Sequence, residues 1–173
     1  MTPSENHLFE VNEKRKKLDD NEREIFHHFV AKTLFLTNHP RRDLQTTVAF
    51  LCMRVKSPGQ DDRNKLVRMI RYLRETRVLK LTLEENDMHI VKWWVDSAHG
   101  LHPNMRGHTG QMMILVSEGW RDVYYGSSKQ KIDTKISTET ELLGASDALP
   151  QVLWIQYFIE HQGYNIKDNE FNQ

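Results

Sequence analysis

The hydrophobic pattern of this chain changes from a helical to a strand period near residue 80, so the parts before and after this point must fold in different ways. Before this point apolar residues recur at steps of three and four, as in Phe26, Phe29 and Val30, which is typical of amphipathic helices. After it, over residues 89–96, apolar side chains alternate along the chain, which is typical of a strand. A helical part followed by a strand-rich part predicts an α+β or α/β fold.

Three helices are predicted within residues 22–80, after a polar lead-in over residues 1–21. Asp43 is the expected N-cap of the second helix, and Asp61 or Asp62 is the expected cap of the third. Because the connections are short and contain proline and glycine, these residues predict a small helical module. The expected helices cover about residues 22–39, 44–55 and 62–76.

Residues 86–164 are predicted to form three antiparallel strands and one long helix, followed by a polar tail over residues 165–173. Glu118-Gly119 suits a tight hairpin between the second and third strands. Pro150 is expected to kink or divide the helix, and Gly163 is expected to follow its end. The expected strands cover residues 89–96, 111–117 and 120–127, with a loop over 99–110, and the helix begins at Thr138.

Two carboxylates, Asp96 and Glu141, are the candidate metal ligands and catalytic residues. Asp96 closes the first predicted strand, and Glu141 lies at the start of the long predicted helix. Acidic ligands held on rigid elements are what two-metal phosphodiester chemistry requires. Each residue also has a structural alternative. Asp96 can be a turn or cap residue, and Thr138 with Glu141 fits a capping box in which the glutamate satisfies a backbone N–H.

A local excess of positive charge marks the third predicted helix, although the whole chain has equal numbers of basic and acidic residues. Residues 61–80 hold seven basic and three acidic side chains. A helix with such a face can follow a phosphate backbone, whose contacts give affinity without sequence specificity. The alternative is an ordinary solvated helix face. The candidate nucleic-acid-binding residues of this helix are Arg63, Lys65, Arg68, Arg71 and Arg74.

The remaining composition narrows the classes of protein to consider. No apolar run approaches the ~18–20 residues of a membrane helix, and the first ten residues lack a secretory pattern, so neither a membrane protein nor a secreted one is expected. Cys52 is the single cysteine, which excludes an intramolecular disulfide and fits a reducing compartment. His99, His102 and His108 share one loop, but their spacing matches no standard zinc site.

Several short motifs occur in a fixed order over nearly the whole chain, from about Leu8 to Gly163. They are the segment 26–36, Arg41-Arg42-Asp43, Arg71-Tyr72-Leu73-Arg74-Glu75-Thr76, Asp96-Ser97-Ala98, Arg106-Gly107-His108-Thr109-Gly110, Ser128-Lys129-Gln130-Lys131 and Ser137-Thr138-Glu139-Thr140-Glu141. In this order they resemble the C-terminal end of the polyprotein of copia-type retrotransposons, in which the tail of reverse transcriptase is followed by RNase H. Arg42 departs from the Arg-Pro-Asp of that family, and Ser97-Ala98 depart from its Asp-Ala-Asp or Asp-Ala-Ser.

The resemblance implies a thumb-like helical connection module followed by a partial RNase H-like fold. It implies hydrolysis of the RNA strand of an RNA–DNA hybrid, with Asp96 and Glu141 as ligands of Mg²⁺ or Mn²⁺. Arg106 and Lys129, which lie in matching motifs, join the candidate nucleic-acid-binding residues. The implied partners are RNA–DNA hybrid or other nucleic acid and the rest of the polyprotein. The implied location is the cytoplasm, in virus-like particles, or the nucleus.

The resemblance also implies that this chain is catalytically incomplete. The Tyr-x-Asp-Asp polymerase motif of the family has no counterpart here. Its third RNase H carboxylate follows a fourth strand that pairs in parallel with the first, and Asp168-Asn169 is a superficial match because no apolar strand precedes it. Without that strand, the strand ending at Asp96 is expected to be an unpaired edge that promotes self-association. The alternatives are a non-catalytic nucleic-acid-binding remnant and a purely structural fragment.

Overall fold

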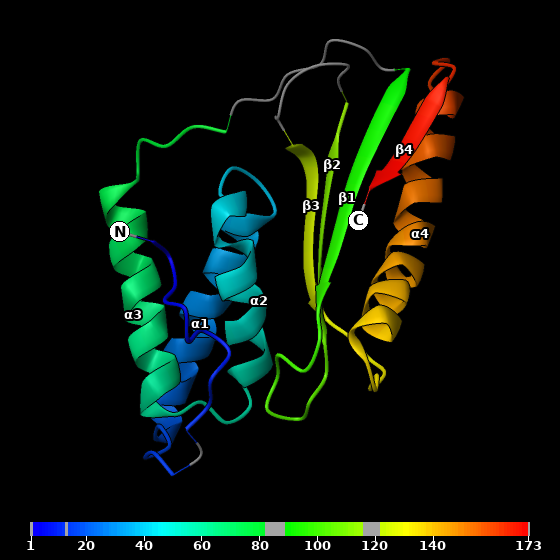
Figure 1. The fold of residues 1–173 in the computed structure, drawn as a ribbon. Coiled ribbons are helices and arrows are strands. Elements are labelled where there is room, and N and C mark those ends of the chain that lie inside the picture. Colours follow the sequence, from blue (N-terminus) through cyan, green and yellow to red (C-terminus); the bar gives the residue numbers. More distant parts are fainter. Residues whose placement is uncertain (1, 13, 82–88, 116–121, 173) are drawn as a thin grey trace. The chain divides into compact units, whose positions relative to one another are not determined.

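The computed structural model describes residues 2–12, 14–81, 89–115 and 122–172. The chain divides into two compact units, Met1–Leu81 and Thr82–Gln173, here called the helical unit and the sheet unit (Figure 1). The first contains helices and the second a sheet with one long helix, so the fold is a mixed α+β fold, as the change of hydrophobic period predicts. Among the described residues, no helix is both long and apolar enough to cross a membrane.

The helical unit contains α1 (Asp20–Thr37), the short 3-10 helix η1 (Arg42–Leu44), α2 (Gln45–Arg54) and α3 (Gln60–Glu75). The three predicted helices are confirmed, and their ends differ from the expected ones by one or two residues. Their apolar stripes meet in one core. The buried residues of this core are Leu8, Phe26, Val30, Leu44, Val48, Phe50, Leu51, Leu66 and Met69.

The expected N-cap role of Asp43 is wrong, because η1 leads directly into α2 and Asp43 lies within η1. Its carboxylate instead accepts hydrogen bonds from Nε and Nη2 of Arg41, at 3.0 and 2.7 Å. Burial acts to raise the pKa of Asp43, but hydrogen bonds from Arg41 and Tyr72 outweigh it and hold that pKa below its usual value. Arg41 also donates to the carbonyl and the hydroxyl of Thr76. These motif residues therefore tie the start of α2 to the end of α3.

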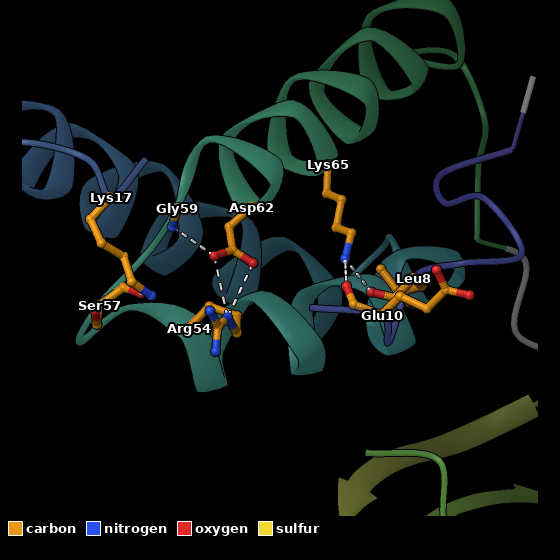
Figure 2. A network of polar contacts seen from close by, with 8 residues as sticks. All are labelled: Leu8, Glu10, Lys17, Arg54, Ser57, Gly59, Asp62 and Lys65. Atoms are coloured by element: carbon orange, nitrogen blue, oxygen red, sulfur yellow. Dashed lines mark hydrogen bonds and ion pairs between the residues drawn. The ribbon is translucent and has the colours of Figure 1, made fainter. Parts of the chain in front are cut away.

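Asp62 stabilises the start of α3 from the third residue of the helix, and not as its N-cap. Gly59 is the N-cap, and its backbone N–H donates to the Asp62 carboxylate at 2.8 Å. Nε of Arg54 donates to the two oxygens of the same carboxylate at 3.1 and 3.2 Å (Figure 2). Asp62 is 3% exposed, so this ion pair lies inside the helical unit.

The expected polar lead-in is packed against the helices rather than loose. Leu8 is buried in the core of the helical unit. Nζ of Lys65, on α3, donates to the carbonyls of Leu8 and Glu10 at 2.7 and 2.5 Å (Figure 2). The sequence pattern misses this contact because the apolar residues of the segment are few and follow neither helical nor strand spacing.

The sheet unit contains a four-stranded sheet in the order β3-β2-β1-β4 (Figure 1). Its strands are β1 (Ile90–Ala98), β2 (His108–Ile114), β3 (Asp122–Lys129) and β4 (Asp168–Asn172). β1, β2 and β3 pair in antiparallel fashion, which confirms the three predicted antiparallel strands. β4 pairs with β1 in parallel.

β4 corrects two expectations, the polar tail and the unpaired first strand. β1 has β2 on one side and β4 on the other, so β1 is not an edge of the sheet. Side chains add to the backbone pairing, because Nζ of Lys92 lies 3.2 Å from Oε2 of Glu170 and Nδ2 of Asn169 donates to Gln156 at 3.0 Å. A short strand at a sheet edge needs no apolar run, since main-chain hydrogen bonds to its neighbour hold it.

The limits of the other strands differ from the expected ones at one end of the sheet. β1 continues two residues beyond Asp96, and β2 begins at His108, inside the expected loop. Ser97 pairs with Thr109 across these added residues. The expected hairpin at Glu118-Gly119 lies outside the described residues.

One long helix, α4 (Ser137–His161), lies across one face of the sheet (Figure 1). It is continuous through Pro150, so the expected division does not occur. Gly163, with φ of +95°, follows the C-cap Gln162 as expected. The core between α4 and the sheet consists of Val91, Trp93, Met113, Leu115, Val152, Ile155 and Ile159.

Candidate functional site

The backbone of α4 lies directly against β1 beside Asp96. A Cβ at Gly144 would clash with Oγ of Ser97, so only glycine permits this approach. Ser97 is buried toward α4, whereas Asp96 is exposed on the other face of the sheet, in keeping with the alternation of a strand. Oδ1 of Asp96 accepts a hydrogen bond from the backbone N–H of Ser97 at 2.8 Å.

Glu141 is exposed and lies close to one helical turn before Gly144, at the same end of β1. β4 pairs with β1 only from Ile90 to Trp94, so no described strand lies on that side of the last four residues of β1. The two candidate carboxylates therefore belong to the same end of the sheet unit.

The capping-box alternative for Glu141 is wrong. The N-cap of α4 is Ile136, which makes no side-chain cap hydrogen bond, and Thr138 is already inside the helix. Oε2 of Glu139 accepts a hydrogen bond from a backbone N–H near the helix start, that of Lys135, at 2.8 Å. The position of Glu141 is therefore not explained by capping.

Two carboxylates do not complete a metal site. Within the described ranges, no group of three His, Cys, Asp or Glu side chains is arranged to hold a metal ion. Carboxylate oxygens are the ligands that Mg²⁺ prefers, but a two-ion site needs further acidic ligands to fix both ions. The role of Asp96 and Glu141 as metal ligands stays a prediction.

A buried polar network, which the sequence patterns did not indicate, supports this end of the sheet. Its centre is Gln130, which follows β3 and is 1% exposed. Nε2 of Gln130 donates to the carbonyl of Thr140 at 2.8 Å and to Oγ1 of Thr109 at 3.0 Å, and its backbone N–H donates to the carbonyl of Gly107 at 2.9 Å. One side chain therefore joins β2, β3 and the first turn of α4, directly beside Glu141. The sequence gives one indication of this network. Its residues all belong to the ordered motifs described above, and they are Gly107, Thr109, Gln130 and Thr140.

Replacing Gly144 with alanine is expected to destabilise the sheet unit by about 1–3 kcal/mol, because the new Cβ forces α4 away from β1. Adding Ser97→Ala removes the clashing hydroxyl and is expected to restore part of this loss. Urea unfolding followed by tryptophan fluorescence measures both effects, since the tryptophans all lie in the sheet unit. A Gly144→Ala variant as stable as the wild type would contradict the close helix–strand contact.

Two of the loop histidines form a buried pair. Nε2 of His102 lies 3.1 Å from Nδ1 of His108, and Nε2 of His108 lies 2.7 Å from Oγ of Ser127. Burial lowers the pKa of both rings to about 4, and the neighbouring His108 and Lys129 add to this effect for His102. The pair is therefore neutral at pH 7 and contributes to the packing of the loop on the sheet.

The candidate nucleic-acid-binding residues of α3 fall into two groups, and the first holds the N-terminal segment. Lys65 binds two backbone carbonyls there, and burial lowers its pKa despite the nearby carboxylates. Nη1 of Arg68 lies 2.6 Å from Oε1 of Glu5. These two cations already serve the fold of the helical unit, so they are poor choices for contacts with phosphate.

The second group is open to solvent. Arg71 and Arg74 are exposed and form no ion pair with any other described residue. Arg63 is also exposed, and its Nη1 lies 3.9 Å from Oε1 of Glu22, which is the outer limit of an ion pair. Of the predicted residues on α3, Arg71 and Arg74 can therefore contact a phosphate backbone without breaking an ion pair of the helical unit, and Arg63 would give up only this long one.

Arg106 and Lys129 lie at the same end of the sheet unit as Asp96. Lys129 pairs across the sheet with His108, which pairs in turn with Ala98. Burial, and then the charge of Arg106, lower the pKa of Lys129, while Asp133 acts to raise it. Two cations thus lie near each other beside the end of β1 that carries the candidate aspartate.

Comparison of the chain with protein-family models, with curated proteins and with solved structures finds no match. The candidate site is therefore defined by its own residues. Exposed carboxylates lie at the end of β1 and the start of α4, two cations lie at the same end, and a buried network holds the backbone between them.

Proposed function

We propose that this chain is a nucleic-acid-directed module of a retrotransposon reverse transcriptase and RNase H, with an RNase H-like sheet unit. The parent activity is the metal-dependent hydrolysis of RNA in RNA–DNA hybrids. Asp96 and Glu141 are its proposed acidic site residues. Because the described carboxylates do not complete a metal site, the part proposed for this chain itself is to bind the hybrid and to present these two carboxylates.

The order and direction of the strands is the observation that carries this proposal. The resemblance implies three antiparallel strands, a helix over one face and a fourth strand parallel to the first, and β1, β2, β3, α4 and β4 agree with that arrangement. Asp96 on β1 and Glu141 near the start of α4 match the motif positions of the first two carboxylates of that family. The contact between Ser97 and Gly144 brings the start of α4 to the end of β1 that carries Asp96.

The surrounding charge supports nucleic acid as the proposed ligand. Lys129 beside the acidic residues is suited to phosphates that flank a scissile bond, because backbone contacts position a nucleic acid without reading its sequence, whereas Arg106 would have to leave its ion pair with Asp133, at 3.0 Å, to join it. The 2′-hydroxyl groups are what would distinguish the RNA strand of a hybrid from DNA.

Binding and cleavage of an RNA–DNA hybrid, compared in EDTA, Mg²⁺ and Mn²⁺, test this function. A divalent ion is expected to strengthen hybrid binding by the wild type and to have little effect on the Asp96→Asn variant, because the ion would offset repulsion between the carboxylates and the phosphates. Cleavage is expected to stay at background, since two carboxylates do not fix two ions in line with the phosphate.

Asp147→Asn is the matched control, because it removes an exposed carboxylate elsewhere on α4 and should behave like the wild type. Equal ion dependence in the wild type and in Asp96→Asn would contradict the role of Asp96. Cleavage that Asp96→Asn abolishes would show instead that the described carboxylates suffice for catalysis.

A second candidate, binding of nucleic acid without chemistry, is favoured by the exposed arginines of α3. Replacing Arg63, Arg71 and Arg74 together with alanine is expected to flatten the salt dependence of duplex binding, because each lost phosphate contact lowers the slope of log K against log salt by about 0.9. Fluorescence anisotropy between 50 and 200 mM salt, roughly the range over which such contacts are titrated, measures the slope.

The control removes the same charge from other exposed positions of the helical unit, Lys14, Lys16 and Lys56. This triple variant should keep the wild-type slope. If both triple variants change the slope equally, the α3 arginines are ordinary surface residues and the helix is not a binding face.

A further inference from the structure

The side of α4 that is not packed on the sheet carries several large exposed apolar side chains. This outer stripe consists of Leu142, Leu149, Leu153, Trp154, Tyr157 and Phe158, and each of these side chains is between 41% and 71% exposed. Leu142, Leu149 and Leu153 follow helical spacing, so they share one face. The rings of Trp154 and Phe158 stack beside them with centroids 5.4 Å apart.

The area of the outer stripe is of the size that a stable protein interface needs. An aromatic side chain buries about 150–250 Å² in a full contact, and the three aromatic residues here are each more than half exposed. With the three leucines, the stripe offers apolar area of the order of the ~800 Å² that each partner contributes to a standard interface. The largest apolar patch of a typical monomer is about 300–600 Å².

We propose that the outer stripe is the interface of a homodimer, in which two copies of α4 pack antiparallel about a two-fold axis near Pro150. The stripe runs from Leu142 to Phe158, so Pro150 is its midpoint. Full overlap of two antiparallel stripes therefore sets one register. Leu142 lies opposite the partner's Phe158, and Ser146 lies opposite the partner's Trp154.

The chemistry of the stripe fits a second copy in this orientation. Two of its leucines, Leu142 and Leu149, lie in its N-terminal half and all of its aromatic residues lie in its C-terminal half, so antiparallel pairing sets an aliphatic half against an aromatic half. The same register brings exposed Glu139 opposite the partner's His161, twice by symmetry. Antiparallel helix dipoles are also favourable, because each N-terminus lies beside the C-terminus of the partner.

Analytical ultracentrifugation of the full chain over a concentration series tests this proposal. The wild type is expected to show a reversible monomer–dimer equilibrium, and Tyr157→Glu is expected to weaken it on the order of 100-fold, since the charge enters the interface twice. Phe35→Glu is the matched control, because Phe35 on α1 is 64% exposed and Tyr157 is 63% exposed. Both substitutions are at exposed positions, and circular dichroism checks that both variants are folded.

Single cysteines in a Cys52→Ser background test the register. Pro150→Cys is expected to give a disulfide-linked dimer on oxidation, because the two copies of this position meet at the axis. Leu142→Cys is expected to give none, because its two copies lie about 24 Å apart along the axis of an antiparallel pair. A monomer at every concentration, a dimer lost with Phe35→Glu rather than Tyr157→Glu, or cross-linking through position 142 would each overturn the proposal.

Discussion

Replacing Asp62 with alanine is expected to destabilise the helical unit by about 3 kcal/mol or more, because it breaks a buried ion pair and leaves a charge without its partner. The Asp62 side chain is 4% exposed and binds both Arg54 and the N–H of Gly59. Its loss removes the ion pair and the cap of α3 together. Hydrogen exchange measures the effect, because amides in α2 and α3 report the helical unit separately from the sheet unit.

Asp61→Ala is the control for this substitution. Asp61 is adjacent in sequence and also forms an ion pair, with Nη1 of Arg15 at 2.9 Å, but its side chain is 26% exposed and that of Arg15 is 52% exposed. An exposed pair of this kind contributes about 1 kcal/mol or less. Equal losses of protection in the two variants would contradict the structural role assigned to Asp62.

Lowering the pH from 6.5 to 4 is expected to destabilise the sheet unit by several kcal/mol through His102 and His108. Burial lowers the pKa of each ring from 6.5 to about 4, so folding favours the neutral form. Since one pKa unit corresponds to about 1.36 kcal/mol, lowered pKa values of this kind correspond to a loss on the order of kcal/mol, and the contributions of the two rings are not additive because the rings contact each other. That stability is fully present above pH 6.5, where both states are neutral, and it is lost as the pH falls toward the folded-state pKa.

Urea unfolding monitored by tryptophan fluorescence at a series of pH values measures this loss. His108→Asn is expected to reduce the pH dependence, because asparagine can keep a polar contact without titrating in this range. His99→Gln is the control, because the ring of His99 is exposed and outside the buried pair. A pH dependence that is unchanged in His108→Asn would contradict the buried neutral pair.

The elements that the sequence predicted correctly are those whose side chains follow a period. Val91, Trp93 and Val95 alternate and are buried on one face of β1, and the stripe of α1 is buried at Phe26 and Val30. β4 was missed because a short edge strand is held by main-chain bonds to β1, which leave no hydrophobic pattern. Packing of the N-terminal segment was missed because it depends on Lys65 binding carbonyls from more than fifty residues earlier in the chain.

The residues of the candidate site likewise divide into those that the sequence indicated and those that it missed. Asp96 and Glu141 could be singled out because each stands at the end of a periodic element. Gln130 could not, because a buried polar side chain between a strand and a loop has no periodic neighbours, and its partners come from three other segments. The sequence also could not show which α3 cations hold the fold and which are open to solvent. Lys65 and Arg71 have the same charge and differ only in their partners.

A titration with Mn²⁺, followed by amide NMR, tests most directly whether Asp96 and Glu141 share a metal ion. Carboxylates about 4–7 Å apart would bind one ion together, given the ~3.5–4 Å metal spacing of two-ion sites. Amides at the end of β1 and at the start of α4 are then expected to broaden at the same Mn²⁺ concentration, and either Asp96→Asn or Glu141→Gln should abolish the broadening at both places. Broadening near Glu141 that persists in Asp96→Asn, or that occurs at a different Mn²⁺ concentration from that near Asp96, would contradict a shared site.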